Sequence, residues 1–291
     1  MSTATAPAPS RRTARTDGSG VNFARVIRSE WIKVTTVPST VILLATTLVV
    51  MVGIAALVAW SWAVTAEMLA DDPTMGPAMG VGTGMDLQAM VYDTPASGVL
   101  FGQLLIAALA VVLVASEYST GMIRSTMVAV PTRTPAMLGK AIIIGVVAFV
   151  IGVVGAFASY LISQPLLAPE NLEFGLDAPW VLPSIINTGT LLAAIAVMGV
   201  ATGSLLRSTA GGVVTIIGVL FVLPVIVQLI SGLADWIPDA ARFLPSNAGT
   251  QLVATNIADG ALNQLEGGLV LGGWAVLLLI VALIVNKRRD V

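Results

Sequence analysis

The sequence predicts an all-α integral membrane protein with six transmembrane helices. Hydrophobic residues make up 56% of the 291 residues, charged residues only 10%, and the mean hydropathy is +0.94. A soluble domain carries about 25% charged residues, so polar groups could not cover this chain in water. Six segments are long and apolar enough to cross a bilayer, which takes about 20 helical residues. The alternating pattern of barrel strands is missing.

The first segment, residues 1–20, is basic and rich in Ala, Pro, Ser and Thr. A signal peptide would continue into a short apolar stretch and a cleavage site, and neither follows. We therefore expect a disordered cytoplasmic tail.

Residues 21–36 predict an amphipathic helix, because their apolar and basic side chains separate at helical spacing. Such a helix lies along a membrane surface with its cations near anionic headgroups. Pro38 then turns the chain into the first span. We assign membrane-surface anchoring to Phe23, Arg25, Arg28, Trp31 and Lys33.

The remaining residues, 37–291, form a six-span domain. Its predicted spans run from Pro38 to Val64, Ser97 to Ser116, Met137 to Ser163, Leu182 to Leu206, Ala210 to Ser231, and Gly268 to Asn286. Residues 232–267 mix apolar and polar positions in pieces too short to span. We expect them to form one or two short helices at the outer face, or dipping into it.

The distribution of basic residues predicts the orientation of the chain. All of the 14 lysines and arginines except Arg242 fall in the N-terminal segments, in the second and fourth connections, or after the last span. Acidic residues concentrate in the other loops. Both termini are therefore expected in the cytoplasm.

The residue types exclude several kinds of chemistry. The sequence has no cysteine and no histidine, which excludes disulfides, Cys or His zinc sites and a histidine base. No G-x-x-x-x-G-K-[ST] motif occurs, so the chain is not expected to hydrolyse ATP itself. We expect no catalytic residue, metal or cofactor in this chain, and no enzymatic activity of its own.

The predicted spans contain no charged residue away from their ends, which argues against ion coupling and favours an apolar or amphiphilic cargo. Their polar residues are neutral and have two interpretations. They form hydrogen bonds between helices, or they line a translocation pathway. The second interpretation suits Gln103, Asn187 and Gln228 best.

The stretch "ASEYSTGMIRSTMVAVPTR", residues 115–133, follows the second span. Its residues 117–131 are compatible with a helix whose apolar side chains spread around the wheel. A helix lying on lipid would separate its faces, whereas a helix contacted on several sides need not. An ordinary inner loop is the alternative.

Three stretches resemble bacterial type-2 ABC transporter permeases. "SEWIKVTTVPSTVILL" resembles the N-terminal signature of this family, and "SEYSTGMIRSTMVAVPTRTPAMLGKA" is similar to its E-[YF]-x-x-G-x-I-R-x-x-L-x-x-x-P-x-R loop. "LPSNAGTQL", before the last span, also looks like the family. The resemblance extends from about Val21 to Arg289, and Met127 stands where leucine is commoner.

The resemblance implies roles for these segments. Residues 21–36 would be the elbow helix, and residues 117–131 a coupling helix inserted into a separate ATPase subunit. The positions implied in ATPase coupling are Glu117, Tyr118, Gly121, Met122, Arg124 and Arg207.

The resemblance also implies an assembly and a location. One permease chain would form half of a pathway, completed by a second copy or a related permease. Two ATPase subunits would bind ATP and Mg, and the assembly would export a drug, lipid, peptide or metabolite across a bacterial plasma membrane. The lipid bilayer is the other partner, and nucleic acid is not expected. The alternatives are an ion- or proton-coupled secondary transporter, or a non-transporting membrane partner of an immunity or signalling complex.

Overall fold

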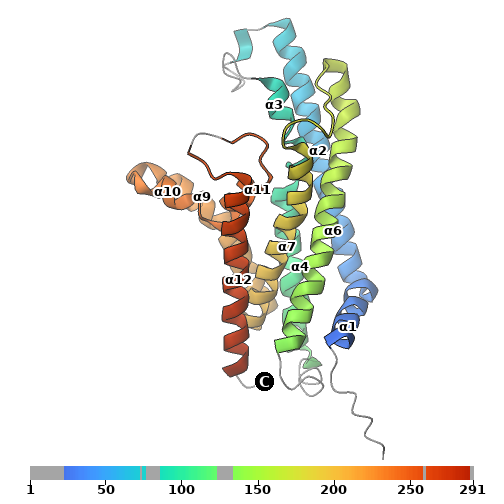
Figure 1. The fold of residues 1–291 in the computed structure, drawn as a ribbon, viewed down its shortest axis with the longest axis vertical. Helices are drawn as coiled ribbons and strands as arrows, with labels where there is room; N and C mark the ends of the chain where they lie inside the picture. The colour runs from blue at the N-terminus through green and yellow to red at the C-terminus, as the bar shows by residue number, and fades with distance from the viewer. Residues whose placement is uncertain (1–22, 73, 77–85, 123–133, 258–259, 289–291) are drawn as a thin grey trace, which may run out of the picture.

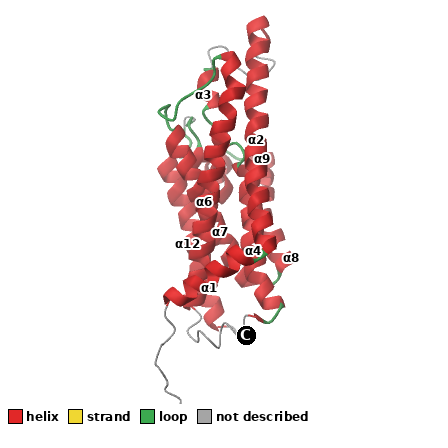
Figure 2. Ribbon diagram, turned by 90° about the vertical axis from the view of Figure 1, so that its right-hand side faces the viewer, coloured by secondary structure: helices red, strands yellow, loops and turns green. Residues whose placement is uncertain are grey.

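The computed structural model describes residues 23–72, 74–76, 86–122, 134–257 and 260–288. These residues form helices and loops and no strand, and Figure 2 shows the helices running lengthwise through an elongated bundle. Six helical segments are long and apolar enough to cross a membrane, as predicted, so the chain is a multi-pass membrane protein. They are Pro38–Asp71, Leu87–Ser119, Thr134–Glu170, Val181–Leu206, Thr209–Leu233 and Gln264–Arg288.

The first helix, α1 (Phe23–Thr36), lies against α6 (Thr134–Leu167) and the start of α2 (Pro38–Asp71) at one end of the bundle (Figure 1). The break between α1 and α2 falls at Val37, which is extended and precedes Pro38. Proline disfavours helical backbone at the residue before it but fits the first turn of a helix. The last turn of the final helix, near Arg288, lies at the same end, which we call the α1 end.

Helix α2 is longer than the span predicted for it. It has 34 residues, about 51 Å of helix, whereas the hydrocarbon core is about 30 Å thick. The expected loop 65–96 is therefore partly helical, and it also contains α3 (Leu87–Val91) and η2 (Thr94–Ala96). We call this the α3 end of the bundle.

Helix α7 (Val181–Leu206) is the centre of the bundle and packs on α4 (Val99–Ser119), α6 and α12 (Gln264–Arg288). The contact with α6 depends on two glycines. A Cβ at Gly152 would lie 2.7 Å from Gly189 Cα and 2.8 Å from Thr188 O. Because no side chain fits there, the two helices approach backbone to backbone. Between α6 and α7 lies η3 (Ala168–Glu170).

The fifth span bends part-way along its length. It consists of α8 (Thr209–Ile217), a π-helical turn labelled η4 (Gly218–Val222), α9 (Leu223–Ile230) and η5 (Ser231–Leu233). The π turn ends two residues before Pro224, which lacks an N–H for the helical ladder. Beyond it, α9 and α10 (Trp236–Ala241) reach away from the other helices (Figure 1).

Short helices occupy residues 232–267, as predicted. After α10, α11 (Pro245–Val253) packs between α7 and α12 and buries Ala248, Leu252 and Val253. It therefore belongs to the packed bundle, while α10 projects from it.

Candidate functional site

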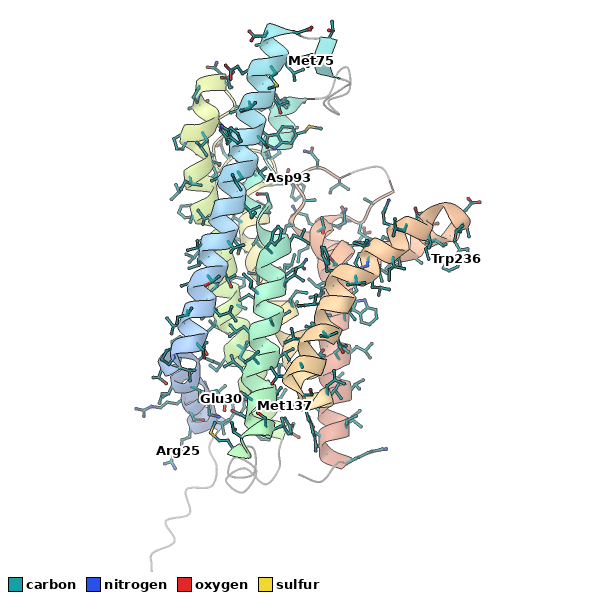
Figure 3. All side chains as sticks on the ribbon, turned by 180° about the vertical axis from the view of Figure 1, so that it is seen from behind. Arg25, Glu30, Met75, Asp93, Met137 and Trp236 are labelled. Carbon is teal, nitrogen blue, oxygen red and sulfur yellow. The ribbon has the colours of Figure 1, made fainter. Side chains whose placement is uncertain are left out.

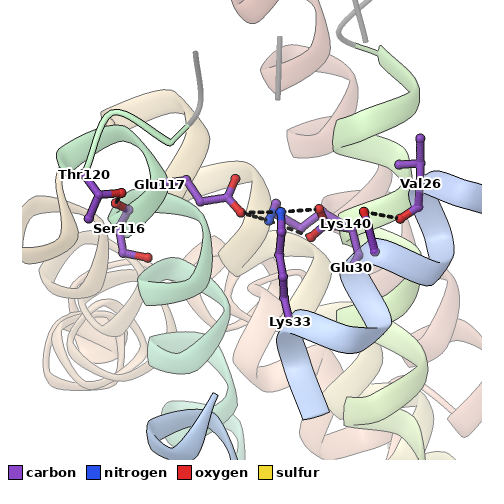
Figure 4. A network of polar contacts seen from close by, with 8 residues as sticks. Val26, Glu30, Lys33, Ser116, Glu117, Thr120 and Lys140 are labelled. Atoms are coloured by element: carbon purple, nitrogen blue, oxygen red, sulfur yellow. Dashed lines mark hydrogen bonds and ion pairs between the residues drawn. The ribbon is translucent and has the colours of Figure 1, made fainter. Parts of the chain in front are cut away.

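Four charged side chains from three helices meet at the α1 end (Figure 4). Lys140 of α6 places its Nζ 2.7 Å from Glu117 Oε1 of α4 and 2.8 Å from Glu30 Oε2 of α1. Lys33 of α1 places its Nζ 2.7 Å from Glu30 Oε1 and 2.9 Å from the same Glu117 oxygen. Each ammonium thus bridges both carboxylates, and the four charges sum to zero. We call this group the ion cluster.

The ion cluster is enclosed by the bundle. Glu30, Glu117 and Lys140 are 4%, 3% and 8% exposed, and Lys33 is partly buried. Taking single charges out of water is costly, and only close pairing offsets that cost. An unpaired member would therefore be strongly unfavourable, which ties the three helices to one another.

The electrostatic balance at Lys33, which lies outside the spans, favours the charged form. Burial by itself would lower the pKa of the Lys33 ammonium, but hydrogen bonds and charges from Glu30 and Glu117 outweigh burial and raise the pKa. The stability that Lys33 contributes is therefore fully present below its unfolded pKa of 10.5 and is lost only as the pH rises through the raised folded value.

The sequence pattern explains how Glu30 enters the ion cluster. Val26, Glu30 and Val34 follow one another at four-residue spacing and form the buried stripe of α1. Sequence reasoning missed Glu30 and Lys140 as site residues. The available signal was a carboxylate on the apolar stripe of an amphipathic helix, which requires a cation from another helix.

The ion cluster holds both flanks of the segment expected to be the coupling helix. Glu117 lies in the last turn of α4, and Lys140 lies near the start of α6. Of residues 117–131, the first three belong to α4. Residues 123–133, including Arg124, lie outside the described residues.

Gly121 ends α4 with a left-handed backbone, at a φ of 73°. Its N–H donates to Tyr118 O, and the preceding Thr120 N–H donates to Ser116 O. A glycine is favoured at this position because a Cβ strains left-handed backbone. The side chain of the next residue, Met122, is exposed.

Two further predicted coupling residues lie together. The guanidinium of Arg207 lies 5.1 Å from the centre of the Tyr118 ring, a cation–π contact between the end of α4 and the turn after α7. Arg207 has a φ of 51°, and Ser208 caps the start of α8 by accepting from Gly211 N. Tyr118 lines a small cavity of about 40 Å³ together with Glu30, Glu117 and Lys140 of the ion cluster.

The residues expected at the membrane surface divide into two groups. Phe23, Arg25, Arg28 and Trp31 are exposed on α1, as anchoring requires. Lys33 was expected among them, but its ammonium is engaged in the ion cluster. The reason is its position on the edge of the buried stripe, where Glu30 and Glu117 are in reach.

The structure does not bring together the three residues proposed to line a pathway. Gln103 is buried and lines a large cavity at the α3 end. Asn187 Nδ2 donates to Leu252 O and to Gln264 Oε1, which is the interhelical hydrogen bonding considered as the alternative. Gln228 is exposed on α9, on the part of the fifth span that leaves the bundle.

No protein-family model matches the chain, and a search of curated proteins finds no match. The resemblance to type-2 permeases therefore rests on the stretches quoted above.

Proposed function

We propose that this chain is the membrane-spanning permease subunit of an ATP-binding-cassette exporter. Its six apolar helices supply the spanning body, and its sequence has no motif for nucleotide. A separate ATPase subunit, present in two copies, would bind ATP and Mg and supply the energy. The cargo is apolar or amphiphilic and leaves the cell.

The observation that carries this proposal is the ion cluster. It links α1 to the last turn of α4 and the first turns of α6, the two helices that flank the expected coupling segment. A force on that segment would therefore act on α4, α6 and α1 together. Such rigid-body movement is a common way to switch which side of a site is open.

The fifth span favours a second permease chain as partner. In its most apolar window only 11% of residues are buried, compared with 67% in α7. Its exposed side chains include Val214 and Leu229, at 70% and 80% exposure. We propose that a second copy or a related permease covers part of this surface and completes the pathway.

The orientation follows from the basic residues at the α1 end. Arg25, Arg28, Lys287 and Arg288 are exposed there, and positively charged residues stay on the cytoplasmic side. We propose that the α1 end faces the cytoplasm of a bacterial cell across its plasma membrane.

The test is whether the chain assembles with an ATPase subunit and stimulates it. The chain is co-expressed with candidate Walker-motif ATPase subunits from the same organism, and the expected result is a complex that hydrolyses ATP faster than the ATPase alone. Glu117→Ala should abolish this stimulation, while Asp239→Asn, at an exposed pair of 3.8 Å on α10, should not. Failure of any ATPase to co-purify would overturn the proposal.

One observation favours a second candidate, a secondary transporter. Asp93 is a carboxylate beside a cavity at the α3 end, and buried ionisable groups are what hold a coupling ion. Proteoliposomes containing this chain alone decide between the two. Transport driven by an imposed proton gradient without an ATPase would support the second candidate, and transport requiring ATP and the ATPase would support the first.

A further inference from the structure

A cavity of about 840 Å³ lies at the α3 end of the bundle. Residues of α2, α3, α4, α7 and α11 line it, together with the segments around η2 and after α11. Its volume falls within the range of about 300–1,000 Å³ typical of small-molecule sites. It is separate from the ion cluster, which occupies the α1 end.

The walls of the cavity are mostly apolar and carry charge of one sign. Val58, Leu100 and Leu191 contribute apolar surface. Among the described residues that line it, the ionisable side chains are Asp86 and Asp93, and none is basic. An apolar hollow with carboxylates favours a ligand that is both apolar and positively charged, and it repels an apolar anion.

Asp93 is held in place with part of its carboxylate available. Its Oδ1 accepts from Thr255 N and from Thr255 Oγ1, both at 2.7 Å. These bonds fix the segment after α11 to the segment before η2. Its Oδ2 has no hydrogen-bond donor among the described residues. Figure 3 shows Asp93 at this end of the bundle, where the loops meet the helices.

Gln103 supplies a second and independent indication of a ligand. It is 3% exposed and lines the cavity, yet its amide forms no hydrogen bond with the described residues. Asn187 and Gln264, by contrast, bond to each other. Buried amides are normally paired, so an unpaired one in a cavity wall marks a position where a ligand or its water is bound.

An aromatic side chain completes the site. Trp62 of α2 lies in the cavity wall and is partly buried. Indole is the side chain with the strongest attraction for a cation over its face. The cavity thus combines a carboxylate, an indole, an unpaired amide and an apolar wall.

We infer that this cavity binds an amphiphilic organic cation, with its charged centre near Asp93 and Trp62 and its apolar groups against Leu100 and Leu191. Such cations are the cargo class of the exporter. The role of this cation as cargo rests on the proposed function, whereas its binding in the cavity does not.

Two ions of similar shape and opposite charge test the inference directly. Tetraphenylphosphonium and tetraphenylborate are titrated calorimetrically into the protein in nanodiscs, and the signal of protein-free nanodiscs is subtracted. We expect the phosphonium to bind at least tenfold more tightly than the borate. Equal binding of both ions, a preference for the borate, or no binding above the nanodisc signal would overturn the inference.

Variants locate the site within the protein. Asp93→Asn keeps an oxygen that accepts from Thr255, and it should weaken phosphonium binding at least tenfold. Gln103→Leu should weaken it at least threefold and serves if Asp93→Asn does not fold. Asp71→Asn is the matched control, an exposed acid at the end of α2 outside the cavity wall, and should stay within twofold of wild type. Undiminished binding in a folded Asp93→Asn or Gln103→Leu variant contradicts the assignment.

The outcome separates this inference from the proposed function, because the binding assay contains no ATPase. Charge-selective binding by a chain that recruits no ATPase would retain the site and reject the exporter. If the chain instead stimulates an ATPase but shows no charge-selective binding, the exporter would be retained and the cation site rejected.

Discussion

Glu117 has a special position among the four charges because one of its oxygens, Oε1, serves both lysines. Glu30 uses a separate oxygen for each. Glu117 Oε2 is buried without a hydrogen-bond partner among the described residues. The two lysines therefore converge on a single atom contributed by α4, and this atom joins α4 to both other helices.

Replacing Glu117 with glutamine should destabilise the fold. Lys140 would stay buried with Glu30 as its remaining carboxylate, and breaking a buried ion pair from one side costs about 3–5 kcal/mol. The midpoint of thermal unfolding of the purified protein in detergent measures the loss. Asp239→Asn breaks an exposed pair and should leave the midpoint unchanged.

A double variant tests whether the lost stability comes from the unpaired charge of Lys140. Adding Lys140→Met to Glu117→Gln removes the stranded charge, so the double variant should lose less stability than the two single variants added together. Simple additivity would show that Glu117 and Lys140 do not depend on each other.

The ion cluster also shows what the sequence alone could not predict. The sequence identified Glu117 and Lys33 as important, through the loop motif and the amphipathic helix. It did not identify Lys33 as an internal partner, because only the packing of α1 on α6 decides which side of the helix Lys33 faces. The cavity around Gln103 arises in the same way, from the arrangement of several helices.

At the scale of elements, α6 and α7 approach each other closely because glycines meet across their contact. A Cβ at Gly189 would lie 2.7 Å from Phe149 O, and a Cβ at Gly152 would meet the backbone of α7. Small residues allow this approach, and close packing is what holds membrane helices together when lipid is as apolar as the helices.

Gly152→Ala should therefore push α6 away from α7. The added methyl would contact backbone atoms that cannot rotate aside, and overpacking of this kind costs about 1–3 kcal/mol. Unfolding in one detergent compares it with Gly53→Ala, where a Cβ on α2 meets nothing within 4 Å. An unchanged midpoint for Gly152→Ala would contradict a backbone-to-backbone contact.

The elements themselves were largely predictable. All six spans occur near their expected positions, because the length and hydropathy of a segment indicate whether it can cross the membrane. Hydropathy does not report which way a side chain faces, so it could not distinguish Gln103 in a cavity from Gln228 on an exposed arm. The bend of the fifth span had a visible cause in Pro224, but its direction depends on the neighbouring helices.

At the scale of the whole molecule, an even number of spans leaves α1 and the end of α12 at the same end of the bundle (Figure 1). The connection between α6 and α7 lies at the other end. The two ends should therefore differ in whether a reagent added outside an intact cell can reach them.

The absence of cysteine from the sequence makes the test simple. Glu173→Cys, exposed between η3 and α7, should react with a membrane-impermeant maleimide on intact bacterial cells. Lys287→Cys, exposed at the end of α12, should react only after the cells are permeabilised. The opposite labelling pattern would reverse the proposed orientation, and labelling of both from outside would contradict a six-span chain.

The four charges are made at different times on the ribosome. Glu30 and Lys140 are 110 positions apart, so at about 5–20 residues per second Lys140 is synthesised about 6–22 s after Glu30. In that interval the cation within reach of Glu30 is Lys33, one turn further along α1. Lys33 can therefore pair with Glu30 from within α1 before Lys140 is synthesised. The contact between Lys140 and Glu30, which joins α1 to α6, can form only after α6 has been synthesised.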